Sequence, residues 1–327
     1  MPKASAVRSI LRTVEDRGWA ACLVPAERRF DLWRELNERF ERGEFDELFF
    51  EERLRYFEQP IVEAPEWARS ILIVAIPDPA FSIRFGWQGR EIALSVPPTF
   101  IRWQELGEPR VRRLLEERMG QGTVRADIAV LPRKLLAARA GLARYGRNNL
   151  TYVEGMGSYH RLASLYTSVP CDDGTWRDLE ILDSCEACGA CIPACPANAI
   201  DPERFMVHAE RCITYWQEKP EDVSYPEEID FSWQDQFIGC MRCQTVCPHN
   251  QGLLKVEEAG PPFAEEETAA FLRGVTVEEL TDETVAKLRQ HDILDYLELL
   301  PRNLVALLRR AEVEASDTHV GYSDGAR

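Results

Sequence analysis

The chain has 327 residues, which is long enough for two or three domains. Of these residues 45% are hydrophobic, enough for a sizeable core. Fifty-five acidic residues face 39 basic ones, and we expect the net charge of −16 to repel phosphate backbones and anionic lipids. No apolar stretch is long enough to span a bilayer and no secretory signal is recognisable, so a cytoplasmic protein with no membrane partner is expected.

Helices and strands are predicted to alternate over roughly the first 180 residues. Apolar residues at helical spacing indicate the helices, and short apolar or alternating runs bounded by Gly and Pro indicate the strands. Helices are expected at residues 7–17, 26–40, 109–119 and 133–140. Strands are expected at residues 19–24, 71–76, 91–96, 124–131 and 159–169. Such alternation favours an α/β core.

The composition changes after Asp183. Cys, Pro and Gly are prominent from residue 184 to 250 and periodicity is poor, which is typical of a small module stabilised by metal. A helical pattern returns from about residue 263 to 310, and the residues after it are polar and small. We expect an α/β domain at 1–180, a ferredoxin-like domain at 181–255, a helical region at 256–314 and a disordered tail at 315–327.

Eight of the ten cysteines lie in this module. They stand two or three residues apart in a long chain, which favours metal ligation over a disulfide framework. The bacterial ferredoxin run, C-x2-C-x2-C-x3-C-P, is formed by Cys185, Cys188, Cys191 and Cys195 with Pro196. A second set lacks one cysteine of that run, for which Cys212 is the obvious replacement; it consists of Cys240, Cys243 and Cys247 with Pro248.

Two [4Fe–4S] clusters are therefore expected. In such runs the cysteine before the proline ligates the other cluster. One cluster would be held by Cys185, Cys188, Cys191 and Cys247. The other would be held by Cys195, Cys212, Cys240 and Cys243. A pair of zinc sites is the alternative, but zinc sites do not need the trailing proline, which occurs twice here. Cys22 and Cys171 are expected to be bystanders.

Several motifs in sequence order resemble the epoxyqueuosine reductases, a family related to the reductive dehalogenases. The stretch from Ala137 to Asn148 is similar to that family's AGLGWIGKN segment, and Gly157-Ser158 to its following glycine–serine. Both cysteine sets continue the match, together with Arg211-Cys212-Ile213 and Asn250. The resemblance covers roughly residues 120–250.

The resemblance implies a nitroreductase-like, cobalamin-binding α/β domain followed by the dicluster module and a short C-terminal helical region. Electrons would pass through the clusters to make cob(I)alamin, and Asp127 falls where the family carries its proton-donating aspartate. A cofactor-binding role follows for Gly141, Gly146, Arg147, Asn148, Gly157, Ser158 and Arg161. The implied substrate is a small molecule or a modified nucleoside, and the implied electron donor is a low-potential ferredoxin or flavodoxin.

Each of these roles has a plainer alternative. Asp127 precedes apolar residues, and burial would raise the pKa of its carboxyl and make it a competent acid; otherwise it caps the helix that follows or lies at a strand end. The glycines can form a helix C-cap and a turn rather than approach a flat ligand. The arginines can be solvated surface residues.

The sequence also departs from the family. The family's GRDYH stretch is replaced by Ser95–Trp103, and its two aspartates between the last paired cysteines by Met241 and Arg242. With the acidic net charge, these changes make tRNA a doubtful partner. The main alternative to a reductase is a non-catalytic dicluster electron carrier, or the reducing partner of a separate corrinoid protein.

Overall fold

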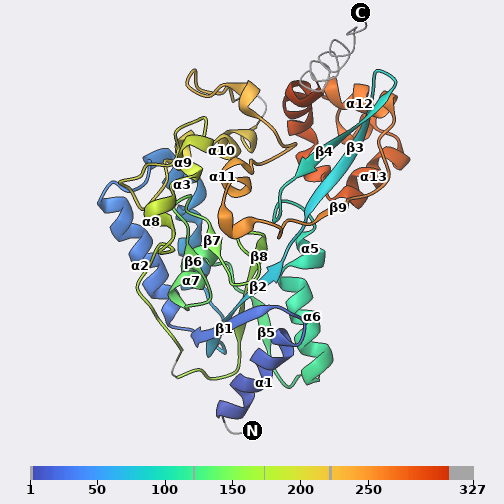
Figure 1. Ribbon diagram of the computed structural model, residues 1–327. Helices are drawn as coiled ribbons and strands as arrows, with labels where there is room; N and C mark the ends of the chain where they lie inside the picture. The colour runs from blue at the N-terminus through green and yellow to red at the C-terminus, as the bar shows by residue number, and fades with distance from the viewer. Residues whose placement is uncertain (1–2, 121, 173, 221–222, 309–327) are drawn as a thin grey trace, which may run out of the picture. The chain divides into compact units, whose positions relative to one another are not determined.

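The computed structural model describes residues 3–120, 122–172, 174–220 and 223–308 (Figure 1). They fall into two compact units, each made of segments that are distant in sequence. The first unit holds residues 3–79, 102–210 and 242–254. The second holds residues 80–101, 211–241 and 255–308. The units do not follow the domain boundaries expected from the sequence, and the expected tail at 315–327 lies outside the described residues.

The first unit is built on a four-stranded antiparallel sheet with the strand order β1-β2-β8-β5. Its strands are β1 (Ala20–Pro25), β2 (Ser70–Pro77), β5 (Ala126–Ile128) and β8 (His160–Thr167). Its longer helices are α1 (Lys3–Glu15), α2 (Arg28–Glu41), α6 (Glu108–Met119) and α7 (Arg133–Arg139). Shorter helices are α3 (Glu47–Arg53), α4 (Glu58–Val62) and α5 (Trp103–Leu106), with a 3-10 turn, η1 (Arg55–Phe57). The α/β content expected from the sequence is thus present, in an antiparallel arrangement.

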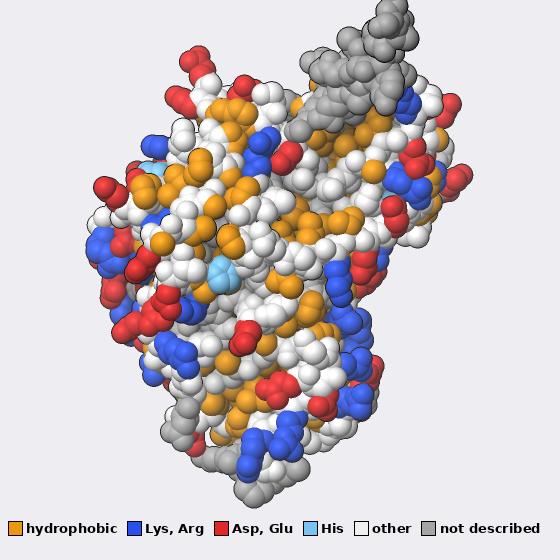
Figure 2. Space-filling model, viewed as in Figure 1, with side chains coloured by type: hydrophobic (Ala, Val, Ile, Leu, Met, Phe, Trp, Pro, Cys, Tyr) orange, Lys and Arg blue, Asp and Glu red, His pale blue; other side chains and the backbone are white. Residues whose placement is uncertain are grey.

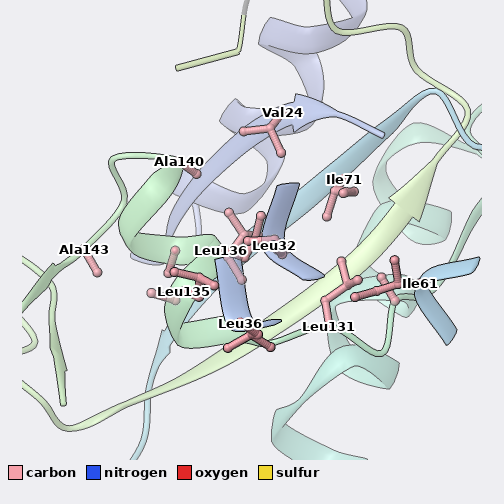
Figure 3. Close-up of a cluster of buried hydrophobic side chains, with 14 of the residues drawn as sticks. Val24, Leu32, Leu36, Ile61, Ile71, Leu131, Leu135, Leu136, Ala140 and Ala143 are labelled. Carbon is pink, nitrogen blue, oxygen red and sulfur yellow. The ribbon is translucent and has the colours of Figure 1, made fainter. Parts of the chain in front are cut away.

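Strand β2 is apolar from Ile71 to Ile76 because helices cover both faces of the sheet. On one face, Ile71 and Ile73 pack with side chains of α2 and α7, as Figure 3 shows for Ile71, Leu32 and Leu136. On the other face, Leu72 and Val74 belong to a second cluster with side chains of α1 and α6. Successive residues of a strand point to opposite faces, so both sets of side chains are mostly apolar in a strand that is buried on both sides.

The second unit contains a three-stranded sheet with the order β4-β3-β9. Its strands are β3 (Ala80–Trp87), β4 (Arg90–Val96) and β9 (Val256–Glu258). Positive φ at Gln88 and Gly89 gives the two-residue turn between β3 and β4 the twist that hairpins favour. Its helices are α10 (Ile213–Gln217), α12 (Glu265–Leu272) and α13 (Asp282–His291), with 3-10 turns η3 (Phe231–Trp233), η5 (Val277–Glu279) and η6 (Leu294–Leu299).

The expectation that residues 91–96 belong to the N-terminal α/β domain is therefore wrong. Their hairpin lies in the second unit because β3 pairs in parallel with β9, more than 150 residues later, and the Gly86 amide donates to the Phe263 carbonyl. Across the four described ranges, no helix combines the length and the apolar character needed to cross a membrane.

Candidate metal centre

A short hairpin of the first unit forms one wall of the candidate site. Strands β6 (Arg144–Tyr145) and β7 (Thr151–Tyr152) pair antiparallel, and the Gly146 amide donates to the Leu150 carbonyl at 2.8 Å. Asn149 adopts φ 56°, a left-handed conformation that asparagine tolerates better than most residues. The Asn-Asn pair therefore turns the chain tightly enough for Asn148 and Tyr152 to lie together.

One-turn helices present the cysteines of this unit. Helices α8 (Cys185–Cys188) and α9 (Cys191–Ala194) follow each other, with Gly189 at φ 58° between them. Helix α9 packs against α11 (Arg242–Thr245), which is followed by Cys247 and the 3-10 turn η4 (Pro248–Asn250). Proline suits the first position of such a turn, since its missing N–H has no partner there in any case. This packing brings Cys247 of the second set close to the cysteines of the first set.

Four cysteines and the hairpin line one small cavity. It is bordered by Gly146, Arg147, Asn148, Tyr152, Cys185, Cys188, Gly189, Ala190, Cys191, Cys247 and Pro248. The four cysteines line the same cavity, but among the described residues no three His, Cys, Asp or Glu side chains are grouped as a single metal ion would require. A cubane takes one thiolate at each of its four irons, so ligands spread around a cavity fit it.

Gly157 and Ser158 contact residues 244–250, the segment that carries Cys247. The Ser158 amide donates to Asn250 Oδ1 at 2.8 Å, and the Ser158 hydroxyl donates to Gln244 Oε1 at 2.9 Å. A Cβ at Gly157 would collide with Asn250 Oδ1 and lie 2.8 Å from the His249 carbonyl oxygen. This glycine–serine pair lets β8 and the segment that carries Cys247 approach closely.

Two more of the residues expected to bind cobalamin contact the cysteine module. Arg147 Nη1 donates to the Pro202 carbonyl at 2.6 Å, and Asn148 Nδ2 donates to the Cys243 carbonyl at 3.3 Å. Gly146 lies so close to Tyr152 that a Cβ would collide with its ring. The segment Gly146–Asn148 therefore lines the cavity and is hydrogen-bonded to the cysteine module. The sequence motif alone did not distinguish this role from cofactor binding.

Gly141 and Arg161 lie elsewhere and have structural partners. Gly141, at φ 73°, ends α7, and the Leu142 amide behind it donates to the Ala137 carbonyl, as in an ordinary helix C-cap. The Arg161 side chain is only 7% exposed, and its Nη2 lies 3.0 Å from Oδ2 of the fully buried Asp78. The residues expected to bind cobalamin thus do not outline a corrin site in the described part of the chain.

Asp127 lies in a different setting from the one expected. Its side chain is 59% exposed, and its Oδ1 accepts the Ile128 amide and lies 4.0 Å from Arg112 Nη1. The apolar environment is missing because β5 is a three-residue edge strand and Asp127 points away from the core. In the register, Asp127 pairs with Tyr166, six residues along β8 from His160, or roughly 20 Å at about 3.3 Å per residue.

The other four expected ligands are distributed over the two units. Cys195 and Cys243 belong to the first unit, where Cys195 Sγ accepts the Ala199 amide at 3.4 Å. Cys212 and Cys240 belong to the second unit, and Cys212 is the N-cap residue directly before α10. Of the remaining cysteines, Cys22 lies in β1, and Cys171 Sγ donates to the Leu23 carbonyl at 3.5 Å.

Tyr152 and His160 were not singled out as site residues from the sequence. Burial, and then a hydrogen bond to Cys247, raises the pKa of the Tyr152 hydroxyl. His160 is buried between the Thr151 hydroxyl and the Gly157 carbonyl, at 3.1 and 3.0 Å, and burial lowers its pKa to about 4. In the sequence, each of these residues stands out only as a polar side chain beside apolar ones. That pattern does not reveal which residue the side chain contacts.

Comparison with known proteins agrees with this site. Residues 184–250 match the family described as a 4Fe-4S double cluster binding domain. An epoxyqueuosine reductase from Leadbetterella byssophila is 35% identical over 129 residues, which are 39% of this chain and 40% of that protein. One from Cyclobacterium marinum is 30% identical over 185 residues, 56% of each chain. The chain thus covers about half the length of these relatives.

Solved structures agree on the fold. Epoxyqueuosine reductase from Bacillus subtilis superposes with a TM-score of 0.61 at 20% identity, covering 94% of this chain and 82% of that one. An epoxyqueuosine reductase crystallised with a modified tRNA-Tyr stem loop gives a TM-score of 0.58 at 20% identity, covering 94% and 80%. The similarity to the epoxyqueuosine reductases that the motifs indicated is therefore confirmed, with a mixed α/β fold and a double-cluster iron–sulfur segment.

Proposed function

We propose that this protein is an iron–sulfur reductase of the epoxyqueuosine reductase type. The observation that carries the proposal is the cavity of the first unit, where three cysteines of one run meet Cys247 of the other. That combination is the one expected when two ferredoxin-type runs exchange their last cysteines. A zinc site built from the cysteines of one run would not need a cysteine from the other run.

The proposed ligands follow from the cavity and the spacing. The first cluster takes Cys185, Cys188, Cys191 and Cys247, which line the cavity together. The second takes Cys195, Cys212, Cys240 and Cys243, an assignment supported by their spacing and by the double-cluster match over residues 184–250. When bound, the clusters supply single electrons. The chain holds their ligands through the hairpin around Asn148 and through the pairing of Ser158 with Asn250.

Cobalamin is proposed as the second cofactor on the strength of the family likeness alone. The residues first expected to hold it fasten the iron–sulfur segment or make structural contacts, so they do not fit a corrin and we derive no step through one. The proposed proton donor is Asp127, supported by its place in the order of motifs.

The proposed substrate is a modified nucleoside in tRNA. The doubt about tRNA drawn from the net charge is not borne out, since one similar reductase has been solved with a tRNA stem loop. Figure 2 shows basic side chains gathered where Figure 1 places α6. That helix carries Arg110, Arg112, Arg113 and Arg118. Local basic clusters bind phosphates even on an acidic protein, because screening limits the reach of the net charge to about 10 Å. A low-potential ferredoxin or flavodoxin remains the proposed electron donor.

Anaerobic purification tests the proposal at each level. Iron and acid-labile sulfide should each approach eight per chain, as two cubanes require, and corrinoid absorbance should accompany the iron–sulfur band. Stoichiometric zinc without sulfide would overturn the cluster assignment. If the protein holds the full iron content but neither binds a corrinoid nor reduces epoxyqueuosine in tRNA, it is an electron carrier and not a reductase. Salt-sensitive binding of a tRNA stem loop would support the substrate class.

A further inference from the structure

One surface of the first unit combines an exposed aromatic ring with basic side chains. Trp103 begins α5 and is 45% exposed, whereas the other seven of the eight tryptophans, all within the described residues, are buried or half-buried. Helix α6 follows directly, and Figure 2 shows basic side chains over it. Its arginines 110, 113 and 118 make no ion pair with an acidic side chain of the described residues.

The acidic residues of α6 do not cancel this charge. Glu108 is buried and lies 2.7 Å from Arg133 Nη2, and Glu116 lies 3.9 Å from Arg112 Nε. Glu117 is then the one carboxylate of the helix left against three arginines without acidic partners. The exposed surface of α6 is therefore basic in a chain whose net charge is −16.

The backbone holds Trp103 against the first turn of α6. The Gly107 amide donates to the Trp103 carbonyl at 2.8 Å, and the Gly107 carbonyl accepts the Arg110 amide at 3.0 Å. A Cβ at Gly107 would lie 2.6 Å from the Trp103 carbonyl oxygen, so a larger residue would displace this connection. Arg113 follows Gly107 by about 9 Å along the helix, at about 1.5 Å per residue. About three stacked nucleotides span that length, at about 3.4 Å each.

A ring and a guanidinium at this spacing suit an unpaired stretch of RNA. Unpaired bases stack on aromatic side chains, and arginines bind the phosphates that join them. A base-paired stem offers the same phosphates but keeps the faces of its bases stacked on one another. The arginines therefore serve both forms of RNA, whereas the ring adds affinity only for unpaired nucleotides.

The same helix reaches the proposed proton donor. Arg112, in the turn that follows Gly107, has its Nη1 4.0 Å from Asp127 Oδ1. RNA that lies along α6 therefore passes beside the Asp127 carboxyl. This proximity connects the basic surface with the proposed reaction and separates it from other arginine-rich helices of the chain.

We propose that Trp103 stacks on an unpaired base in the loop of the tRNA substrate and that Arg113 binds a neighbouring phosphate. The inference rests on the proposed tRNA substrate, and it assigns the surface that holds the loop. Since one of the two contacts needs an unpaired base, the protein should bind a stem loop more tightly than a duplex of the same stem.

The test is fluorescence anisotropy with two labelled RNA probes, a tRNA-Tyr stem loop and a blunt duplex with the sequence of its stem. Trp103→Leu should weaken stem-loop binding by about fivefold or more, as loss of one base stack does, and leave duplex binding unchanged. Trp103→Phe keeps an aromatic ring and should retain most of the affinity. Arg113→Gln should weaken binding of both probes and lower the slope of log affinity against log salt by about 1.

Matched controls are available on α2, which packs on the opposite face of the sheet from α6. Phe30→Leu removes a ring that is 43% exposed, and Arg34→Gln removes a guanidinium whose side chain is 65% exposed. Neither should change the affinity for either probe. Iron, sulfide and circular dichroism are measured on every sample, so that the clusters and the fold are known to be intact.

The outcomes separate this surface from the proposed function. If the wild type binds the stem loop and Trp103→Leu and Arg113→Gln bind it equally well, the surface is refuted while tRNA remains the proposed substrate. An equal loss in Arg34→Gln, or an equal loss of duplex and stem-loop binding in Trp103→Leu, also overturns the assignment. A wild type that binds neither probe refutes the surface and the tRNA substrate together, and its iron content still tests the cluster assignment.

Discussion

The two ends of strand β8 have opposite surroundings. At its beginning, His160 and Arg161 are buried, Asp78 is fully buried beside Arg161, and Ser158 is fastened to the segment that carries Cys247. Near its other end, Asp127 of β5 is largely exposed, accepts the Ile128 amide and lies 4.0 Å from Arg112 Nη1. The buried, densely hydrogen-bonded end is the one that adjoins the cluster cavity. The order of motifs along the chain placed both ends in one active site, and the register separates them by roughly 20 Å.

The largest effect at the buried end of β8 is expected for the first cluster itself. Cys247→Ala removes one of the four thiols around the cavity, so the first cluster should be lost and about four of about eight irons should remain. Iron and sulfide analysis after reconstitution measures this. Cys22→Ala, in the core strand β1, is the control and should keep the full iron content. Full iron in Cys247→Ala would mean that this cysteine is not a ligand.

The next effect concerns the buried ion pair at the same end of β8. Asp78→Asn leaves the Arg161 guanidinium buried without its carboxylate, and breaking a buried pair in this way costs about 3–5 kcal/mol. Denaturant unfolding of the wild type and the variant measures the difference. A loss below about 1 kcal/mol would show that Arg161 finds solvent or another acceptor, and that this end of the strand is less enclosed than the structure indicates.

How much of this arrangement the sequence predicted depends on how local each signal is. The double-cluster segment, strand β2 and helix α2 were predictable because cysteine spacing and hydrophobic periodicity are read over a few neighbouring residues. Strand β3 was missed although Phe81, Ile83 and Phe85 alternate with polar residues or glycine, because its partner β9 lies far along the chain. The setting of Asp127 was mispredicted for a related reason. Apolar neighbours indicate a strand, but only the sheet shows that β5 is a short edge.

A pH effect of intermediate size should come from His160. Burial lowers its pKa from 6.5 in the unfolded chain to about 4 in the folded protein. Between these values the unfolded chain binds more protons, so this contribution to stability is complete above about pH 6.5 and is lost as the pH falls towards 4. The total is about 3 kcal/mol, at about 1.4 kcal/mol per unit of pKa. His160→Gln should flatten the dependence of the unfolding free energy between pH 7 and 5. A variant that keeps the wild-type slope would assign it to other groups.

The smallest effect on stability is expected at Asp127. Because its side chain is exposed, Asp127→Asn should change the unfolding free energy by no more than about 0.5 kcal/mol and leave the iron content intact. Activity separates two cases. A proton donor at the reacting bond contributes about 10²–10⁴-fold in rate, and asparagine cannot replace it. A collapse of turnover with clusters and substrate binding unchanged would mean that the reacting bond lies near this exposed end of β8, far from the cluster cavity. Unchanged turnover would leave Asp127 as a surface residue and direct the search for the acid to the buried end of β8.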